Sequence, residues 1–448
     1  MCGSGATFEC SCPKGHLFKW QSQPVHCKMP LGNLVVSSGI LFTGSSPKAV
    51  INLFEQCNIA CMTDRTYRNI QSCYLIPAVH NVWEGNNTVE LQMCREGNVK
   101  VGGDARFCSP GHTAKYASYS LMNMETGVIL ATELVQVTEV KNSCHMELEG
   151  LKKCLAALKQ AGVMVSDLIT DRHSMVKSYM KKEQPSIRHW FDVWHVAKGV
   201  FKKLIAVSKK RDCSQIADWA HSISNHMYWA ASSSNGNGEM VLQKWQSILN
   251  HVCNKHEGHG DLFPTCQHEE ITKDVCWLKM GSKVYKELQD VITSNFLMND
   301  IKKLSPGEQT SDLEAFHSLV CQFVPKSTHY FYDAMKARLL VAALHSNENA
   351  QRSQALKRDG TPRYRLSYPK AKKGEHCLKV VKEGCTYDYV MDLMEEAYDL
   401  RQEFQSYSLA RKGLPMSNSP PPPLTSQVNR VSLEEALARH KARFNKSH

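Results

Sequence analysis

The chain has 448 residues, enough for roughly two or three domains with a large core. Its composition is 42% hydrophobic and 22% charged, and no run approaches the ~18 apolar residues that a membrane helix needs. The N-terminus has no basic-then-apolar signal layout, so we expect an intracellular protein without membrane segments. The net charge of +11 favours a polyanionic partner, and 18 cysteines in such a chain favour metal ligands and buried thiols over disulfides.

Residues 1–29 form a cysteine-rich leader. Cys10, Cys12, His16 and Cys27 could form a small zinc site, although their spacing fits no standard zinc template well. The alternative is a flexible leader whose cysteines have no common function.

Residues 30–95 have a mainly helical pattern. Ser46 and Pro47 predict a helix start, with a capping side chain followed by proline at the first helical position, and Asn58 predicts the end of that helix. Thr63 can begin the next one. Two short helices joined by a tight turn resemble a helix-turn-helix, but helical domains that do not bind DNA use the same geometry, so both interpretations stay open.

The pattern then changes to that of a sheet, which we assign to a domain over residues 96–350. An apolar, strand-like stretch is followed by two glycines and then by Asp104 and Arg106, which we expect at the end of the strand. Asp104 is our first catalytic candidate. Alternating and β-branched residues over 116–124 and 128–140, separated by turn residues, predict a hairpin.

A helix and a second acidic strand end follow the hairpin. Leucines at helical spacing predict a helix over 144–160, which Gly162 stops. A short strand over 163–170 then ends in Asp171. The sequence therefore predicts an αβ sheet with Asp104 and Asp171 at adjacent strand ends.

The stretch from about 174 to 311 is long and helix-rich. Helices are predicted near 191–210, 214–229 and 240–253. A third acid, Glu314, lies beside the apolar face of the helix that follows this stretch.

A histidine and cysteine cluster occurs inside the helix-rich stretch. The pairs His256-x-x-His259 and Cys266-x-His268 could bind one zinc ion, with the residues between them as the knuckle. The alternative is a loop with unrelated polar residues. A zinc-dependent hydrolase is a weaker interpretation because the cluster has no His-Glu-x-x-His arrangement.

Positive charge is concentrated in a basic region over 351–413, which we expect to be helical. Residues 351–382 contain ten Lys or Arg and two acids. Such blocks suit phosphate backbones because each neutralised phosphate releases counterions, although a solvated basic surface is the plainer alternative. The cations that we assign to DNA contact are Lys198, from an earlier basic run, and Arg363, Arg365, Lys370, Lys372 and Lys373. Residues 414–448 are predicted to be a proline-rich linker and a short basic tail helix.

The three acids are separated by 67 and then 143 residues. Two strand-end aspartates and a helix glutamate are what a ribonuclease H-like fold uses to hold two divalent ions. Carboxylate oxygens suit Mg²⁺ or Mn²⁺, and two such ions about 3.5–4 Å apart stabilise both the attacking and the leaving oxygen of an in-line phosphoryl displacement. We therefore predict an α/β protein with a ribonuclease H-like catalytic domain, preceded by a helical region.

Several motifs support a more specific hypothesis: Gly103-Asp-Ala-Arg106, Ser109-Pro-Gly-His-Thr-Ala-Lys-Tyr116, Thr170-Asp-Arg-His173, Phe191-Asp-Val-Trp-His195 and Leu313-Glu-Ala-Phe-His-Ser318. Over roughly His16 to Arg352 the chain resembles eukaryotic DDE-type cut-and-paste DNA transposases and proteins derived from them. Within that class it looks similar to the Kolobok and Mutator-like groups, of the kind often found with a THAP-type zinc finger.

This resemblance implies roles for named residues. Asp104, Asp171 and Glu314 would hold Mg²⁺ or Mn²⁺. Asp192 and His195 match an acid-x-x-His signature that helps organise the site or the helical insertion. Arg106 and Lys198 would contact phosphates. The resemblance also implies that the region from about 174 to 311 is a helical insertion that splits the ribonuclease H-like domain. It further implies DNA as the partner, a homo-oligomer and a nuclear location.

The sequence departs from these relatives at two places. Ala105 stands where relatives usually have glycine, and Cys108 stands where they usually have aspartate. Alanine costs backbone freedom next to a ligand, and the cysteine removes a carboxylate. The intact triad favours a transposase or derived nuclease that hydrolyses a DNA strand, after which the freed 3′-hydroxyl attacks target DNA. The altered surroundings favour the alternative, a domesticated and catalytically inactive DNA-binding or chromatin-associated protein.

Overall fold

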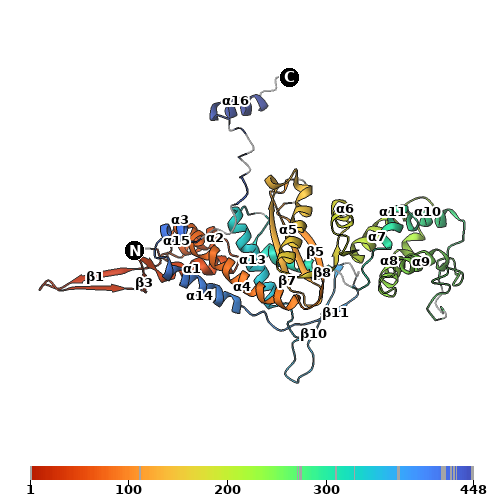
Figure 1. Ribbon diagram of the computed structural model, residues 1–448, viewed down its shortest axis with the longest axis horizontal. Coiled ribbons are helices and arrows are strands. Elements are labelled where there is room, and N and C mark those ends of the chain that lie inside the picture. The colour runs from red at the N-terminus through yellow and green to blue at the C-terminus, as the bar shows by residue number, and fades with distance from the viewer. Residues whose placement is uncertain are drawn as a thin grey trace.

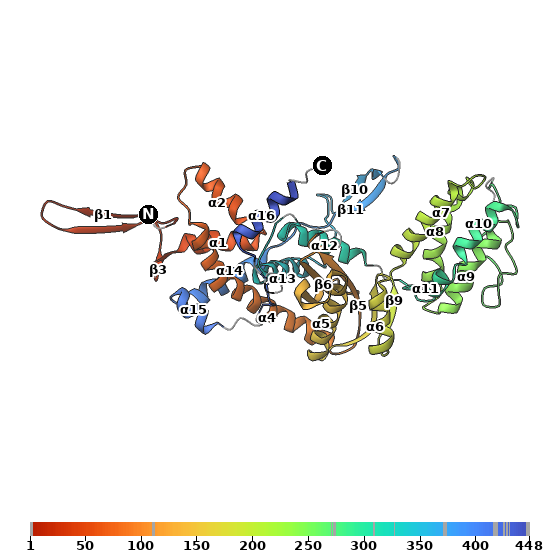
Figure 2. The ribbon, with the colours of Figure 1, turned by 90° about the horizontal axis from the view of Figure 1, so that it is seen from above.

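The computed structural model describes residues 3–109, 113–269, 271, 275–307, 310–326, 328–370, 374–414, 420–423, 426, 429 and 431–444. The molecule is elongated (Figure 1), with a central sheet and its helices in the middle, a long N-terminal hairpin at one end and a helical lobe at the other. A view turned by 90° shows the same three parts along the long axis (Figure 2).

A mixed five-stranded sheet forms the centre, in the order β7-β6-β5-β8-β9. The strands β5 (Asn98–Phe107), β6 (Tyr116–Asn123) and β7 (Ile129–Gln136) are antiparallel neighbours. The strands β8 (Met164–Thr170) and β9 (Arg188–Phe191) continue the sheet in parallel to β5. The predicted hairpin and the predicted strand before Asp171 are thus confirmed, and the chain is a mixed α/β protein.

Helices cover both faces of the sheet. On one face, α5 (Met146–Gln160) and α6 (Ser174–Glu183) pack against apolar side chains of β5, β6 and β8. On the other face, α4 (Ile76–Cys94) and α13 (Tyr332–Glu348) bury the opposite side chains of β6 and β7. The sheet is therefore a rigid layer whose strand ends have fixed positions.

The N-terminal helices begin where the sequence predicts. Ser46 Oγ accepts a hydrogen bond from Ala49 N and caps α2 (Pro47–Gln56). Thr63 Oγ1 accepts one from Thr66 N at the start of α3 (Asp64–Ile70). These bonds satisfy backbone donors that the first helical turn leaves without partners.

This region does not have a core of its own. The helix α1 (Leu31–Phe42) and helices α2 to α4 share one apolar core with α12 (Ser311–Phe323), α13 and α14 (Asp388–Glu403). The buried Arg401 of α14 donates to the backbone oxygens of His26 and Cys27, at 3.2 and 3.0 Å. The segment that leads into α1 is therefore fastened to α14.

The prediction of a helical basic region over 351–413 is wrong in its first half. That part contains an antiparallel hairpin of β10 (Tyr364–Ser367) and β11 (Cys377–Val380), and only α14 and α15 (Tyr407–Gly413) are helical. Prolines at 362 and 369 disfavour a helix, and the aromatic and β-branched residues between them and in β11 favour strands. Further on, the predicted tail helix is present as α16 (Leu433–Phe444).

The helical lobe consists of α7 (Val193–Ser208), α8 (Ile216–Ser232), α9 (Gly238–His251), α10 (Lys283–Ile292) and α11 (Asn295–Ile301). These helices bury their apolar faces against each other in a core separate from those of the sheet, with Trp245 at its centre. The lobe is thus stabilised by its own packing.

The lobe begins later than the predicted boundary at residue 174. The apolar side chains of α6 pack on the sheet and β9 is its fifth strand, so the helical lobe starts at Val193. At its far end, Phe191 N donates to Lys303 O at 2.7 Å and Ser305 N donates to Phe191 O at 3.0 Å. The chain therefore leaves the sheet and returns to it at the same point.

The leader forms an exposed hairpin of β1 (Thr7–Ser11) and β2 (Leu17–Gln21). The small strands β3 (Val25–His26) and β4 (Met29–Pro30) connect it to α1. Across the described residues, no helix is both long and apolar enough to span a membrane.

Candidate functional site

Two of the three candidate acids lie on neighbouring parallel strands. Asp104 lies within β5, and Asp171 directly follows β8, which pairs with β5. Glu314 lies in the first turn of α12, a helix that packs against β5. Their side chains are 28%, 39% and 46% exposed, so solvent reaches all three carboxylates.

Two histidines connect these acids. His195 Nε2 lies 3.0 Å from Asp171 Oδ1 and 3.5 Å from Glu314 Oε1, so its ring bridges the two carboxylates. His317, one turn beyond Glu314 on α12, has its Nδ1 3.3 Å from Asp104 Oδ2. The contacts join the strand ends to α7 and α12 and define one acidic site.

Burial and the neighbouring carboxylates both disfavour ionisation of Asp171. Burial raises the pKa of Asp171 to about 6; the nearby His195 opposes that rise, whereas Asp104 and Glu314 add to it. Like charges at close range make each further ionisation less favourable. A cation bound among the carboxylates would relieve this repulsion.

A fourth acid, Glu147, belongs to the same site but is absent from the sequence prediction. It lies in the first turn of α5, and burial raises its pKa to about 7, with further contributions from Asp104 and Asp171. The sequence offered one signal: Glu147 is in the first turn of the helix that leads into the strand of Asp171. His317 could likewise have been found, because it lies three residues after Glu314 and so on the same helix face.

Glycines let two acid-bearing helices approach the sheet. A Cβ atom on Gly150 of α5 would lie 2.4 Å from the Cβ of Tyr119 on β6. A Cβ atom on Gly102 of β5 would lie 3.2 Å from Leu313 Cδ1, next to Glu314 on α12. Larger residues would push these helices away and separate the carboxylates.

Asp192 organises the site from a buried position, with only 2% of its surface exposed. Its Oδ1 accepts a hydrogen bond from Trp194 N at 2.7 Å and caps α7. Its Oδ2 accepts from Thr310 N at 2.9 Å and from Thr310 Oγ1. Since Thr310 is the N-cap residue of α12, Asp192 joins the starts of the helices that carry His195 and Glu314.

Arg106 is not available for the predicted contact with phosphates. Its side chain is buried, with 4% of the residue exposed, and its Nη2 donates to Val324 O at 2.6 Å. The sequence alone does not reveal that the end of α12 covers this strand position. Arg106 instead fixes α12 against β5.

The two departures from the transposase pattern are accommodated locally. Ala105 pairs with Tyr119 in regular extended backbone, which alanine adopts without strain. Cys108 Sγ accepts a hydrogen bond from Tyr116 N at 3.3 Å.

The predicted DNA-binding cations lie on two exposed elements. Lys198 is exposed on α7, one turn beyond His195, with its Nζ 3.9 Å from the centre of the Trp194 ring. The others lie on or beside the β10–β11 hairpin, where Arg363, Arg365 and Lys370 are exposed. Lys372 and Lys373 are outside the described residues.

Like charges face each other on this hairpin. Arg365 and Lys379 occupy directly opposite positions of the two strands, an arrangement that costs stability unless an anion lies nearby. A hollow of about 530 Å³ is lined by Arg352, Arg363, Tyr364, Arg365, Lys379, Val380, Val381 and Lys382. The β10–β11 hairpin therefore concentrates the positive charge of the basic region over 351–413 on one surface.

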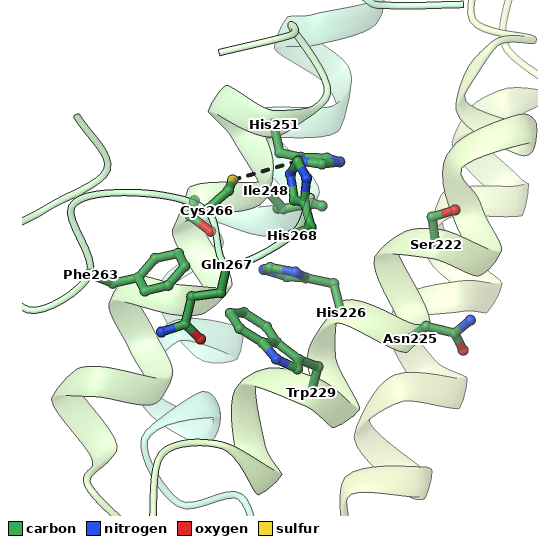
Figure 3. A pocket seen from close by; sticks show the side chains of 11 residues that line it. Ser222, Asn225, His226, Trp229, Ile248, His251, Phe263, Cys266, Gln267 and His268 are labelled. Carbon is green, nitrogen blue, oxygen red and sulfur yellow. Dashed lines mark hydrogen bonds between the residues drawn. The ribbon is translucent and has the colours of Figure 1, made fainter. Parts of the chain in front are cut away.

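The structure brings the predicted histidine and cysteine cluster together, with one of the four predicted residues replaced by another. In the described part of the chain, one group of candidate metal ligands has all its ligand atoms within 4.8 Å of one another: His251, His256, Cys266 and His268. His251 replaces the predicted His259, because α9 ends at His251 and brings this residue to the following loop. Figure 3 shows His251, Cys266 and His268 facing one another beside a cavity of about 330 Å³.

The predicted N-terminal zinc site is not assembled. Cys12 Sγ lies 3.3 Å from His16 Nδ1, but among the described residues neither Cys10 nor Cys27 joins them in a metal-binding group. The hairpin register separates these residues: Cys10 is paired across to Phe18, and Cys27 follows β3.

No protein-family model matches this chain, and a search of the curated proteins finds no match either.

Proposed function

We propose that the chain is a DDE-type transposase or a transposase-derived nuclease. Water would hydrolyse a phosphodiester bond of one DNA strand, and the freed 3′-hydroxyl would then attack a target phosphodiester and displace the 3′-hydroxyl of the target strand. One observation carries this proposal: Asp171 and Glu314 meet at His195, and Asp104, on the neighbouring strand and held by His317, lies close enough to raise the pKa of Asp171. As the motifs imply, such a protein would act in the nucleus as a homo-oligomer.

The donor set fits a hard divalent cation. Four carboxylates supply oxygen atoms, which are the ligands that Mg²⁺ and Mn²⁺ prefer, and their mutual repulsion would fall when a cation binds. Asp104, Asp171 and Glu314 would hold the metal, with Glu147 beside them. When bound, two such ions stabilise the attacking and the leaving oxygen of an in-line phosphoryl displacement.

The other residues of the site position these acids. His317 holds Asp104, and His195 bridges Asp171 and Glu314, while the buried Asp192 fixes the starts of both supporting helices. Positioning of this kind matters because the reaction depends on geometry within about 1 Å.

The proposal includes a ribonuclease H-like fold with the helical lobe inserted into it. Its support is the mixed sheet, whose antiparallel strands β5 to β7 are followed by a helix and the parallel strand β8. The lobe also leaves and rejoins this unit at one point, between Phe191 and Ser305. A lobe attached in this way can extend the DNA-binding surface without disturbing the sheet.

DNA binding would rely on the exposed cations of the β10–β11 hairpin and on Lys198. The opposed Arg365 and Lys379 have no ion pair with a described acidic residue, so a phosphate would be their natural counterion.

The double variant Arg365→Ala with Lys379→Ala should weaken DNA binding in a salt-dependent way. The slope of log K against log salt is negative, and each lost phosphate contact reduces its magnitude by about 1. We therefore expect the slope of the double variant to be less steep by about 2. Fluorescence anisotropy with a labelled duplex at several salt concentrations measures this slope. The matched control, Lys159→Ala with Lys182→Ala, removes two exposed charges from α5 and α6 and should leave it unchanged; an equal loss in both variants would contradict a role for the hairpin.

Metal-dependent cleavage tests the proposed function. The full chain should nick supercoiled plasmid and join oligonucleotide ends with Mg²⁺ or Mn²⁺, and Glu314→Gln should do neither while binding DNA as before. Salt-sensitive DNA binding without cleavage in the native chain would reject the enzyme. That outcome would favour the alternative function, an inactive DNA-binding protein. Cys108, which stands where relatives usually have aspartate, also favours this alternative.

A further inference from the structure

We propose that His251, His256, Cys266 and His268 form a structural zinc site that fastens the loop after α9 to the helical lobe. This site is separate from the acidic site and does not depend on the proposed function.

The four residues come together through the backbone of the loop. His251 is the last residue of α9, and the other three follow within 17 residues of it. Cys266 N donates to His256 O at 2.9 Å, and Glu257 pairs with Thr265 in an antiparallel bridge. This narrow turn has few apolar side chains of its own, so a bound metal would supply the cross-link that a core supplies elsewhere.

The ring contacts of two histidines leave one nitrogen of each for a metal. His268 Nδ1 lies 2.7 Å from Glu269 O, so Nδ1 carries the proton and Nε2 remains for the metal. His256 Nε2 lies 3.0 Å from Asn254 Oδ1, so Nε2 carries the proton. Oxygen acceptors behind metal-bound histidines commonly fix the ring in this way.

The remaining nitrogen of His256 is the clearest single sign of a ligand. His256 Nδ1 is buried and has no hydrogen-bond partner among the described residues. A buried polar atom without a partner costs free energy, and such an atom in a native structure calls for an unseen ligand or water. One ring nitrogen of His256 lies within 4.8 Å of the ligand atoms of His251, Cys266 and His268.

His259, the remaining histidine of the predicted pairs, has a different task. Asn250 Nδ2 contacts both Gly258 O and His259 Nδ1, which makes Nδ1 an acceptor and places the ring proton on Nε2. His259 Nε2 lies 3.2 Å from Cys266 Sγ. It can therefore donate a hydrogen bond to a metal-bound thiolate, which makes it a positioning residue and not a ligand.

The donor set identifies the class of metal. Three imidazole nitrogens and one thiolate suit Zn²⁺, whose structural sites have four tetrahedral protein ligands, and they do not suit Mg²⁺, which prefers oxygen. With all four positions supplied by the protein, no position is left for a reacting water. The rings of His251 and His256 also contact Trp277, with ring centres 6.0 and 5.8 Å apart, so the metal would anchor the loop beside the core of the lobe.

The test uses the purified full chain and a measurement of bound metal that needs no DNA and no enzymatic activity. Elemental analysis should find about one zinc ion per chain. After exchange with Co²⁺, the absorption spectrum should show the d–d bands of tetrahedral cobalt and a thiolate charge-transfer band. Less than a tenth of a zinc per chain, together with no cobalt spectrum, would overturn the proposal.

Four variants locate the site. Cys266→Ser should lose the thiolate band, and His251→Ala should lose the metal. His259→Ala should keep about one zinc per chain, and Cys253→Ser, a change of a nearby cysteine outside the cluster, should keep both metal and spectrum. Metal retained in His251→Ala but lost in His259→Ala, or lost in Cys253→Ser, would show that the assigned ligands are wrong. Circular dichroism of each variant checks that the helices are still formed.

Discussion

Asp171→Asn should abolish metal-dependent DNA cleavage and, at the same time, stabilise the metal-free protein. Losing this carboxylate would remove a metal ligand and with it several kcal/mol of transition-state stabilisation. Because each 1.4 kcal/mol is a factor of ten, we expect a decrease of about 10³-fold or more in the cleavage rate. Initial rates of plasmid nicking with Mn²⁺ measure this effect.

The effect of Asp171→Asn on stability has a definite sign. The pKa of Asp171 in the folded chain, about 6, is above its ordinary value of 3.8, so the folded state prefers the protonated acid. Above pH 6 the fold must keep an unfavourable charge, which asparagine removes. The side chain is 39% exposed, so solvent screening reduces the gain to about 1 kcal/mol at pH 8. The stability gained by Asp171→Asn should shrink as the pH falls through 6 and vanish below 4. Denaturant titrations of both proteins at several pH values, with EDTA present to remove metal ions, measure this difference.

Asp167→Asn provides the matched control on the same strand. Burial favours the protonated form of Asp167, but hydrogen bonds from Ser166, Trp190 and Arg188 outweigh it and lower its pKa. This variant should therefore lose stability at neutral pH, by about 1–3 kcal/mol, and should still cleave DNA where it is folded. If Asp171→Asn also lost stability, or if it kept its cleavage activity, the assignment of Asp171 to a repulsive metal site would be wrong.

The sequence predicted the parts of the fold that depend on local patterns. Turn residues, alternation and helix caps located β6, β7, α5 and β8, and the position of Asp171 directly after β8 follows from the same elements. Asp104 was expected at a strand end but lies inside β5, and its grouping with Asp171 and Glu314 depends on the motifs and not on these local patterns. Glu147 was missed because a glutamate in a first helical turn is ordinary, and only packing at Gly150 brings this one to the site.

Errors arose where long-range packing decides the outcome. Arg106 has the sequence context of a surface cation, yet the end of α12, more than 200 residues later, covers it. His251 joins the metal cluster because α9 ends there, which the spacing of the pairs His256-x-x-His259 and Cys266-x-His268 does not reveal. The prediction of a helical region over 351–413 fails at the β10–β11 hairpin, where Pro362 and Pro369 disfavour a helix.

Asp192→Ala should cause the largest loss of stability among single changes near the site. The change removes the cap of α7 and leaves Thr310 N and Oγ1 without their buried acceptor. A lost cap costs about 1 kcal/mol and a lost hydrogen bond to a charged group about 1.5–3 kcal/mol, so we expect a decrease of about 3–5 kcal/mol in the free energy of unfolding. Denaturant titration of the full chain measures it.

Leu204→Ala separates the loss of stability from the loss of geometry. Leu204 is fully buried on α7, the helix that Asp192 caps. Its truncation to alanine leaves a cavity and should lower the free energy of unfolding by about 2–5 kcal/mol. That cavity lies in the core of the helical lobe, whereas Asp192 also holds the start of α12 and thus Glu314. At a temperature where both variants are folded, Leu204→Ala should cleave DNA like the native chain and Asp192→Ala should be at least about tenfold slower. Equal rates in the two variants would mean that Asp192 only stabilises the fold, and that the helical lobe does not position the acidic site.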